Sequence, residues 1–276
     1  MVVLSKSFKE IFGTEKPIIG MVHFPPLPGT PLYDERAGVD GIIDWVKRDL
    51  LALQEGGIDA VMFGNEGDRP YELKVDTASI ATMSYVIGRI RDLITVPFGV
   101  DVLWDPRASI AVAAAVGAKF VREVFTNVYA SDMGLWNPNA AEALRYRRFL
   151  GIDHVLVFYN INAEFAAPLA ERPVELVARS VVFSSLADAI CLSGPMTGEP
   201  VTSADLKRVK GLIPNVPVIA NTGVRVDNVA ELLEIADGAI VGTSLKIDGN
   251  TWNPVDPQRV KEFMRQVQMV RQRTSV

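Results

Sequence analysis

The amino-acid sequence predicts a single (β/α)8 barrel that spans residues 1–276, and three observations support this fold. Eight apolar, strand-like segments alternate strictly with helix-like segments, which is typical of a parallel sheet covered by helices. The chain has 276 residues, close to the roughly 250 of a typical barrel. The last two strands each end in a glycine turn, as in barrels that bind phosphate after strands 7 and 8. An open, doubly wound sheet is the alternative, but it rarely contains eight regular units without a second domain.

The predicted strands are rich in β-branched residues and nearly continuous in apolar character. In chain order we expect them at Pro17–His23, Asp59–Phe63, Pro97–Leu103, Lys119–Phe125, His154–Asn160, Ala187–Leu192, Val216–Asn221 and Gly238–Thr243. The helices that follow are expected at Val39–Glu55, Thr77–Ile94, Pro106–Val116, Ala140–Leu150, Pro173–Ser184, Ser203–Leu212, Val226–Ile235 and Asp256–Val270. Residues 1–16 form an N-terminal extension, in which Ser7–Gly13 is expected to form a short helix over the bottom of the barrel.

Capping residues and loop lengths agree with these boundaries. Asp105 and Ser203 supply polar helix starts, and helices end at Gly117 and Gly151. Connections from helix to strand are short, whereas those from strand to helix are mostly long. Long loops in a compact domain are usually functional, so we expect the functional site at the C-terminal ends of the strands.

Glycines and small residues follow predicted strands 6, 7 and 8. Glycine lets backbone N–H groups approach an anion closely, and the start of a following helix adds a favourable dipole. The predicted phosphate-binding residues are Ser193, Gly194, Thr197, Thr222, Gly223, Gly242 and Thr243.

Ionisable side chains lie at the same ends of the strands. Isolated polar residues are costly to bury unless they are paired or used. The predicted catalytic residues are His23, Glu66, Asp101 and Glu123, because an imidazole and carboxylates exchange protons near neutral pH. The structural alternative is a salt bridge between strands 3 and 4. Because side chains alternate along a strand, only one of Arg122 and Glu123 can face the barrel mouth.

Amides and a guanidinium complete the set of polar residues at the strand ends. The predicted substrate-orienting residues are Asn65, Arg122, Asn160 and Asn221. Glu66, Asp101 and Glu123 could also hold a divalent metal, since such ions prefer hard oxygen ligands. No fixed ligand spacing supports a metal, so we expect no cofactor.

Composition excludes several classes of protein. The net charge is −5 and the Lys and Arg residues are scattered, which argues against nucleic-acid binding. A single cysteine, Cys191, rules out an internal disulfide and a cysteine-based zinc cluster. The first residues lack the apolar stretch of a signal peptide, and no window approaches the ~20 apolar residues of a membrane span. We therefore expect a cytoplasmic protein without integral membrane association.

Four segments resemble the BtpA family, which includes SgcQ-type proteins: Met21–Gly29, Phe63–Asp68, Ser193–Gly198 and Asp237–Lys246. The resemblance runs from about Pro17 to the end of the chain and implies a TIM-barrel fold. For function, the resemblance points in two directions. BtpA proteins of photosynthetic bacteria are linked to photosystem I assembly or stability at the thylakoid. SgcQ-type relatives instead accompany sugar-uptake and kinase genes.

Two functions therefore remain open. The first is an enzyme that acts on a small phosphorylated or ribosyl-type metabolite by isomerase, lyase or nucleosidase chemistry. Such an enzyme could form a homo-oligomer. The second is a non-catalytic photosystem I assembly or stability factor. An assembly factor predicts an exposed apolar patch, whereas an enzyme predicts a concave polar pocket. The charged residues at the barrel mouth favour the enzyme.

Overall fold

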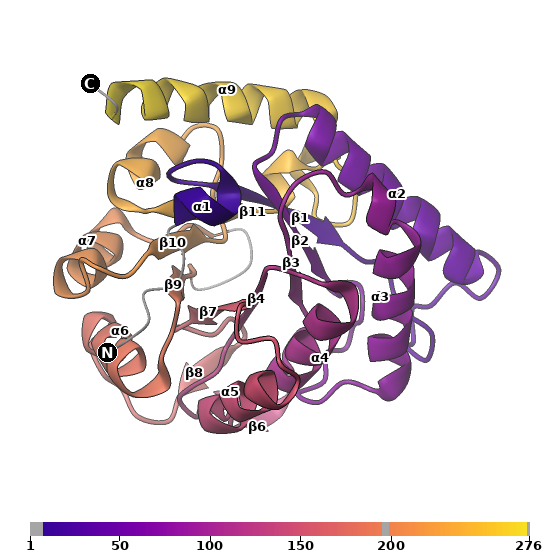
Figure 1. The fold of residues 1–276 in the computed structure, drawn as a ribbon, viewed down its shortest axis with the longest axis horizontal. Coiled ribbons are helices and arrows are strands. Elements are labelled where there is room, and N and C mark those ends of the chain that lie inside the picture. Colours follow the sequence, from indigo (N-terminus) through magenta and orange to yellow (C-terminus); the bar gives the residue numbers. More distant parts are fainter. Residues whose placement is uncertain (1–7, 195–198, 275–276) are drawn as a thin grey trace.

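Eight parallel strands close into a barrel at the centre of the computed structural model, which describes residues 8–194 and 199–274 (Figure 1). The strands are β1 (Ile18–His23), β2 (Ala60–Gly64), β3 (Phe98–Asp101), β4 (Phe120–Glu123), β7 (Leu156–Asn160), β9 (Ala189–Leu192), β10 (Val218–Asn221) and β11 (Gly238–Val241). Their order around the barrel is β1-β11-β10-β9-β7-β4-β3-β2, with β2 pairing again with β1. The predicted (β/α)8 fold is confirmed.

A ring of helices surrounds the strands, as the alternating pattern predicts. The helices that follow the barrel strands are α2 (Gly38–Glu55), α3 (Thr77–Arg89), α4 (Pro106–Val116), α5 (Ala140–Phe149), α6 (Val174–Ser185), α7 (Ser203–Leu212), α8 (Val229–Ile235) and α9 (Pro257–Thr274).

Three predicted helix boundaries differ from the structure by three residues or more. Helix α9 continues to Thr274, four residues past the predicted Val270. Helix α3 ends at Arg89 rather than Ile94, because residues 91–93 form a separate 3-10 turn, η1 (Arg91–Leu93). Helix α8 begins three residues later than predicted. The side chain of Asn228 folds the preceding segment into a turn, in which Oδ1 accepts from the Arg225 N–H at 2.7 Å and Nδ2 donates to the Gly223 carbonyl at 3.0 Å.

Side-chain caps fix the starts of other helices. Asp105 accepts hydrogen bonds from the N–H groups of Arg107 and Ala108, which lack partners within α4. Helix α7 is capped by Thr202, one residue before the predicted Ser203, through the N–H of Asp205. Gly117 ends α4 with φ of +75°, a left-handed conformation that glycine adopts without steric cost.

The lower half of the barrel interior is filled by apolar side chains that point inward from alternate strand positions. Phe120 and Phe158 stack at 4.9 Å between ring centroids. A Cβ at Gly99 would lie 2.2 Å from the Phe120 ring, so only glycine leaves room for this ring on β3. The short helix α1 (Phe8–Phe12) covers this end of the barrel, and its Phe12 ring lies 5.6 Å from that of Phe120. This end of the barrel interior is therefore closed by α1.

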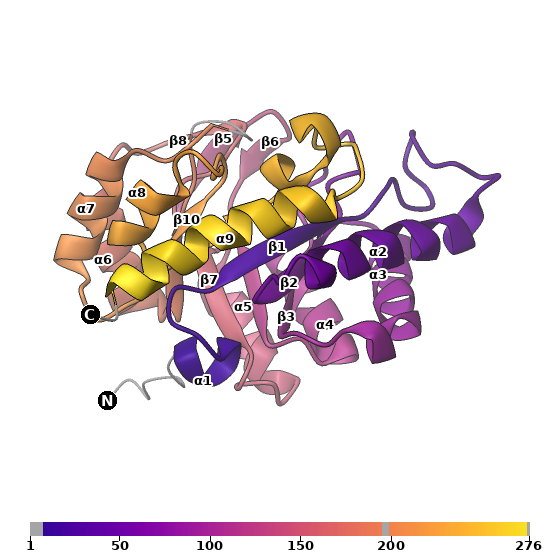
Figure 2. The same ribbon diagram turned by 90° about the horizontal axis from the view of Figure 1, so that it is seen from above.

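A small antiparallel sheet lies at the opposite end of the barrel, where the sequence predicts only loops. Strands β5 (Tyr129–Ser131) and β6 (Gly134–Trp136) come from the segment after β4, and β8 (Ala166–Pro168) comes from the segment after β7. Figure 2 shows these strands at one end of the barrel and α1 at the other. Each strand has three residues, which is too short for an alternating pattern to be recognised in the sequence.

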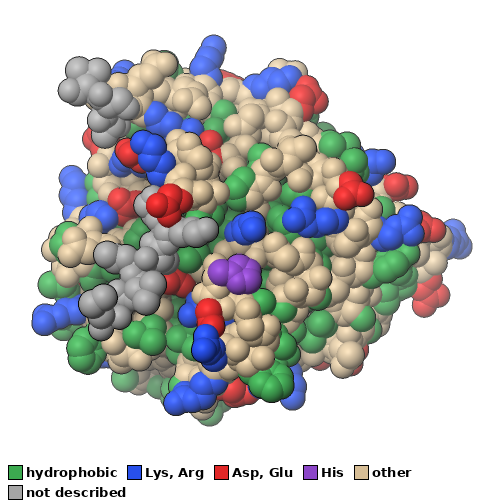
Figure 3. All heavy atoms as spheres, in the orientation of Figure 1, with side chains coloured by type: hydrophobic (Ala, Val, Ile, Leu, Met, Phe, Trp, Pro, Cys, Tyr) green, Lys and Arg blue, Asp and Glu red, His purple; other side chains and the backbone are tan. Residues whose placement is uncertain are grey.

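The surface at the α1 end carries Lys and Arg side chains scattered among Asp and Glu, and neither charge forms a continuous patch there (Figure 3). Within residues 8–194 and 199–274, no helix is both long and apolar enough to cross a membrane.

Candidate active site

A cavity of about 730 Å³ opens at the C-terminal ends of the barrel strands. Side chains from β1, β4, β10 and β11 form its floor, and the loops after β2, β3, β7, β10 and β11 form its walls. The floor residues are Met21, His23, Arg122, Asn221 and Ile240. The cavity thus lies on the face where the long loops predict a site, and where barrel enzymes place their active sites.

His23 and Glu66 face each other in the cavity, with His23 Nε2 3.5 Å from Glu66 Oε1. Burial lowers the pKa of His23 well below its usual value, and the charges of Lys246 and Arg122 lower it further. Burial and the charge of Asp101 raise the pKa of Glu66 to about 8. Near neutral pH the pair is therefore a neutral imidazole beside a carboxylic acid, which can accept and donate a proton respectively.

Two glycines make room for this pair. A Cβ at Gly64, the last residue of β2, would lie 2.6 Å from a carboxylate oxygen of Glu66. A Cβ at Gly242 would lie 3.1 Å from Cε1 of His23. Gly242 belongs to a predicted phosphate turn, but the structure shows a second reason for glycine there. The imidazole packs directly against its backbone.

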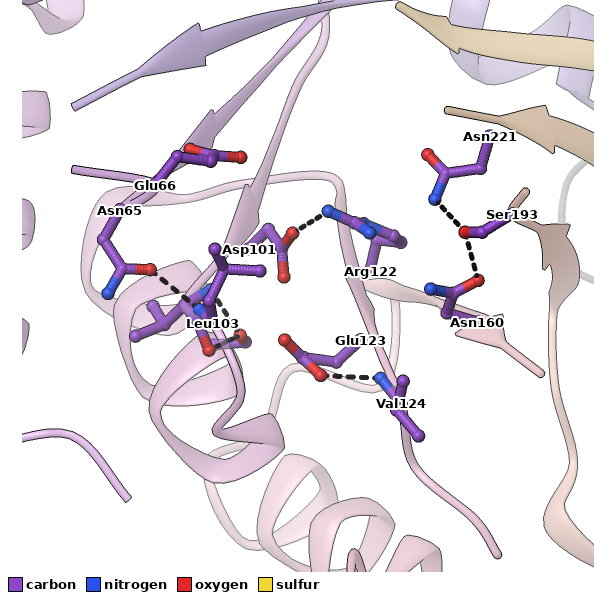
Figure 4. Close-up of polar contacts among 12 residues, drawn as sticks. Asn65, Glu66, Asp101, Leu103, Arg122, Glu123, Val124, Asn160, Ser193 and Asn221 are labelled. Atoms are coloured by element: carbon purple, nitrogen blue, oxygen red, sulfur yellow. Dashed lines mark hydrogen bonds and ion pairs between the residues drawn. The ribbon is translucent and has the colours of Figure 1, made fainter. Parts of the chain in front are cut away.

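Arg122 points from β4 into the barrel and lines the cavity, and an ion pair joins it to Asp101 on β3 (Figure 4). Asp101 has no exposed surface and does not line the cavity. Glu123 is also buried, and its Oε2 accepts from the Val124 N–H at 2.6 Å. Burial raises the pKa of Glu123 well above its usual value, and the charge of Asp101 adds to this. The Asp101 carboxylate is thus engaged by Arg122, and the Glu123 carboxyl group by the backbone of Val124, rather than by a ligand.

Asn160, Ser193 and Asn221 form a hydrogen-bonded chain across β7, β9 and β10 (Figure 4). The Ser193 hydroxyl donates to Asn160 Oδ1 at 3.0 Å and accepts from Asn221 Nδ2 at 2.8 Å. Of the three, Asn221 lines the cavity. Ser193, predicted to bind phosphate, instead holds the two amides in place.

Asn65 lies at the end of β2, but both ends of its amide are engaged by the protein. Its Oδ1 accepts from the Leu103 N–H at 2.8 Å, and its Nδ2 donates to Asp68 at 3.2 Å. It therefore fixes the segment after β3, which carries part of the cavity wall.

The turns after β10 and β11 lie side by side at one edge of the cavity. Thr222, Gly223, Gly242 and Thr243 all line it. The turn after β11 starts the 3-10 helix η2 (Thr243–Leu245), and no side chain in the described part of the chain caps its first N–H groups. The guanidinium groups of Arg225 and Arg259 line the same region. Arg225 is ion-paired with Asp227 at 3.1 Å and Arg259 lies 3.9 Å from Asp256, which leaves the N–H groups of the turn and the remaining guanidinium donors as groups that suit an anion.

The segment after β9 offers fewer free N–H groups at this edge of the cavity than the sequence predicts. The N–H of Gly194 donates to Thr222 Oγ1 at 2.8 Å and is not free for a ligand. The backbone of residues 199–200 packs against Gly194 and Gly223, within 2.0–2.2 Å of where a Cβ would be, so close packing explains both glycines. Thr197, also predicted to bind phosphate, lies outside the described residues.

Divalent metal binding through Glu66, Asp101 and Glu123 finds no support in the geometry. Among residues 8–194 and 199–274, no group of three or more His, Cys, Asp or Glu side chains is placed to hold a metal ion. Asp101 is paired with Arg122 and Glu66 with His23.

Several residues around the cavity were not foreseen from the sequence. They are Tyr71, Trp104, Glu164, Phe165, Arg225, Trp252 and Arg259. All lie in loops or in α9, beyond the strand ends at which the sequence predicts the functional site. Glu164, four residues after the end of β7, is 5% exposed, and a buried carboxylate at a strand end is the signal that could have identified it.

A buried ion pair anchors the segment after β11. Lys246 Nζ lies 2.6 Å from Asp49 Oδ2 on α2, and the other oxygen of Asp49 accepts from the Val255 N–H at 3.1 Å. Asp49 thus closes the loop of residues 246–255, which carries Thr251 and Trp252 on the cavity wall.

The BtpA family pattern matches residues 14–269, nearly the whole chain. The chain belongs to the BtpA family. The family member SgcQ of Escherichia coli, an sgc region protein, is 47% identical over 95% of this chain and 98% of its own length. The photosystem I biogenesis protein BtpA of Synechocystis is 35% identical over 92% of this chain and 89% of its own.

Solved structures of several TIM-barrel enzymes are similar to this family member at low sequence identity. The (S)-3-O-geranylgeranylglyceryl phosphate synthase of Thermoplasma acidophilum, in complex with its substrate sn-glycerol-1-phosphate, aligns with a TM-score of 0.60 at 15% identity. That alignment covers 98% of this chain and 99% of the synthase. Phosphoribosyl anthranilate isomerase of Thermus thermophilus aligns with a TM-score of 0.56 at 11% identity, over 92% and 99% of the two chains. These similarities establish the fold.

Proposed function

We propose that this protein is an enzyme that transfers a proton on a small phosphorylated, sugar-type metabolite bound at the barrel mouth. The observation that carries this proposal is the pairing of His23 with Glu66 inside a cavity, next to the turns after β10 and β11 that would take an anion. Isomerase, lyase and nucleosidase reactions all need such a proton donor and acceptor.

Each polar group has a role in this proposal. Glu66 donates a proton and His23 accepts one. Arg122, held by Asp101, stabilises negative charge that develops on the substrate. Asn221, held by Ser193 and Asn160, orients a hydroxyl or carbonyl group. The phosphate rests on the turns after β10 and β11, and Arg225 and Arg259 balance its charge.

Unpartnered polar atoms support a ligand at this place. Buried polar groups normally have hydrogen-bond partners, because an unmade bond is costly. Within the described residues, buried atoms that lack a partner include Glu66 Oε2, Arg122 Nε, Trp104 Nε1 and Asn160 Nδ2. Glu66, Arg122 and Trp104 line the cavity, and Asn160 lies behind Ser193 and Asn221.

Titration with ribose 5-phosphate and with sn-glycerol-1-phosphate tests the proposal, followed by the amide NMR signals of the described turn residues. We expect saturable shifts at Gly223, Gly242 and Thr243, and weaker binding by Arg259→Ala. Arg208→Ala, an arginine of similar exposure on α7, is the matched control and should bind like the wild type. Saturating concentrations that leave the three signals unmoved would exclude the site.

A partner-binding role of the BtpA type is the second candidate. The observation in its favour is an apolar groove on the outer surface, lined by Leu176, Phe183 and Leu212, in which Phe183 is 87% exposed. The same groove would serve a homo-oligomer. Sedimentation of wild type and Phe183→Ser tests both roles, since the variant should lose any association without losing ligand binding in the cavity. We place the enzyme in the cytoplasm, which cell fractionation tests.

A further inference from the structure

The cavity wall that faces the barrel axis from the loops after β2, β3 and β7 is aromatic. Tyr71, Trp104 and Phe165 all line the cavity. Trp104 meets Tyr71 at 6.0 Å between ring centroids and an interplanar angle of 86°, and Phe165 at 6.3 Å and 78°. Such a cluster of rings is a surface on which a planar group can stack.

This aromatic wall lies across the mouth from the anion turns. Trp104 follows β3, and the turn at residues 222–223 follows β10. In the closed barrel, three strands separate β3 from β10 in either direction. His23 on β1 and Glu66 after β2 lie along one of these two paths. A ligand that extends along this path, with its phosphate on the turns, passes the proton-transfer pair before it reaches the aromatic rings.

The indole N–H of Trp104 favours a ligand ring that can accept a hydrogen bond over a purely apolar group. The residue is 3% exposed, and its Nε1 has no hydrogen-bond partner among the described residues. A hydrocarbon chain would leave this N–H unpaired, whereas a ring nitrogen or a ring carbonyl oxygen would accept its hydrogen bond.

Trp104 is held from behind by the β5-β6-β8 sheet. Its ring lies 5.1 Å from that of Trp136 on β6, at an angle of 70°. Tyr129 on β5 packs against Trp136 in turn, at 5.5 Å. The orientation of the indole is thus fixed by packing before any ligand arrives, as a recognition surface requires.

We propose that the ligand of this cavity is a phosphorylated sugar that carries a planar heteroaromatic ring, that is, a ligand of the nucleoside monophosphate type. The phosphate lies at the turns after β10 and β11, and the ring lies against Tyr71, Trp104 and Phe165. This inference rests on the proposed function, because it uses the same anion site. It adds the chemical class of the group at the opposite end.

Calorimetric titration compares ligands with and without the ring: adenosine 5′-monophosphate and uridine 5′-monophosphate against ribose 5-phosphate. We expect at least one nucleotide to bind about tenfold more tightly than ribose 5-phosphate, the gain typical of stacking one base. Trp104→Phe keeps an aromatic ring but removes the N–H. It should weaken nucleotide binding about three- to tenfold and leave ribose 5-phosphate binding unchanged.

Trp45→Phe is the matched control, because Trp45 lies on α2 under Arg48 and does not line the cavity. It should bind all three ligands like the wild type. Phe165→Leu provides a second variant of the wall, should Trp104→Phe fail to fold, and should again weaken nucleotide binding alone.

The outcomes separate this inference from the proposed function. Equal affinity for ribose 5-phosphate and both nucleotides would overturn the ring site and leave the phosphate site standing. A wall variant that weakens all three ligands equally would also overturn the ring site, since the aromatic residues would then only support the fold. If none of the three phosphorylated ligands binds, both proposals are overturned.

Discussion

Glu66→Gln tests the electrostatics of the candidate site through protein stability alone. The pKa of Glu66 is raised from 4.5 to about 8 by burial and by Asp101. A carboxyl group whose pKa is raised by folding favours the folded state fully only below its usual pKa, and this contribution is lost as the pH rises towards 8. Glutamine mimics the protonated acid and cannot ionise. The stability of the variant relative to the wild type should therefore increase as the pH rises from about 5 to about 8.

The size of this gain follows from the shift. One pKa unit corresponds to about 1.4 kcal/mol, so the rise from 4.5 to about 8 corresponds to about 5 kcal/mol in all, of which roughly 3.5 kcal/mol develops between about pH 5 and pH 8. Urea unfolding of both proteins at several pH values measures the difference in free energy of unfolding. Glu72→Gln, on the exposed part of the same loop, controls for the loss of a carboxylate. A difference for Glu66→Gln that does not change with pH would refute this account of the site.

Three further changes test other parts of the structure. Gly64→Ala places a methyl group on the carboxylate of Glu66 without backbone strain, so ligand binding or turnover should be lost while the melting temperature changes little. Gly88→Ala, where a Cβ meets nothing within 4 Å, is its control and should leave function intact. Asp101→Asn leaves a buried guanidinium without its charged partner, and urea unfolding should show a loss of about 3–5 kcal/mol. A stability equal to wild type would instead support the catalytic role predicted from the sequence. Phe12→Ala empties the bottom of the barrel and should cost about 3–5 kcal/mol by the same assay, and a smaller loss would show that α1 adds little.

The barrel could be predicted from the sequence because its signals are local and repeated. Each strand is apolar and bounded by turn residues, and helix starts such as Asp105 use caps that are visible in the sequence. Errors appear where a tertiary contact decides the boundary. The hydrogen bonds of Asn228 delay the start of α8, and strands as short as β8 depend on partners from a distant loop.

The candidate site could be predicted only in part. Strand ends placed His23 and Arg122 in the cavity, since parallel strands end at one face of a barrel. The same reasoning could not show that Arg122 covers Asp101. That depends on which of the two side chains lies nearer to the cavity along the barrel axis. Nor could it identify Trp104 or Phe165, because a loop has no periodicity that relates sequence position to direction.

The β5-β6-β8 sheet joins segments from two different loops, and this has a consequence for how the family can diversify. Strand β5 pairs with β6 of its own loop and with β8 of the loop after β7. An insertion or deletion in one loop would break its pairing with the other unless the second loop changed as well. Relatives should therefore vary in these two loops together, exchanging one matched pair for another, while the turns after β10 and β11 vary independently of them.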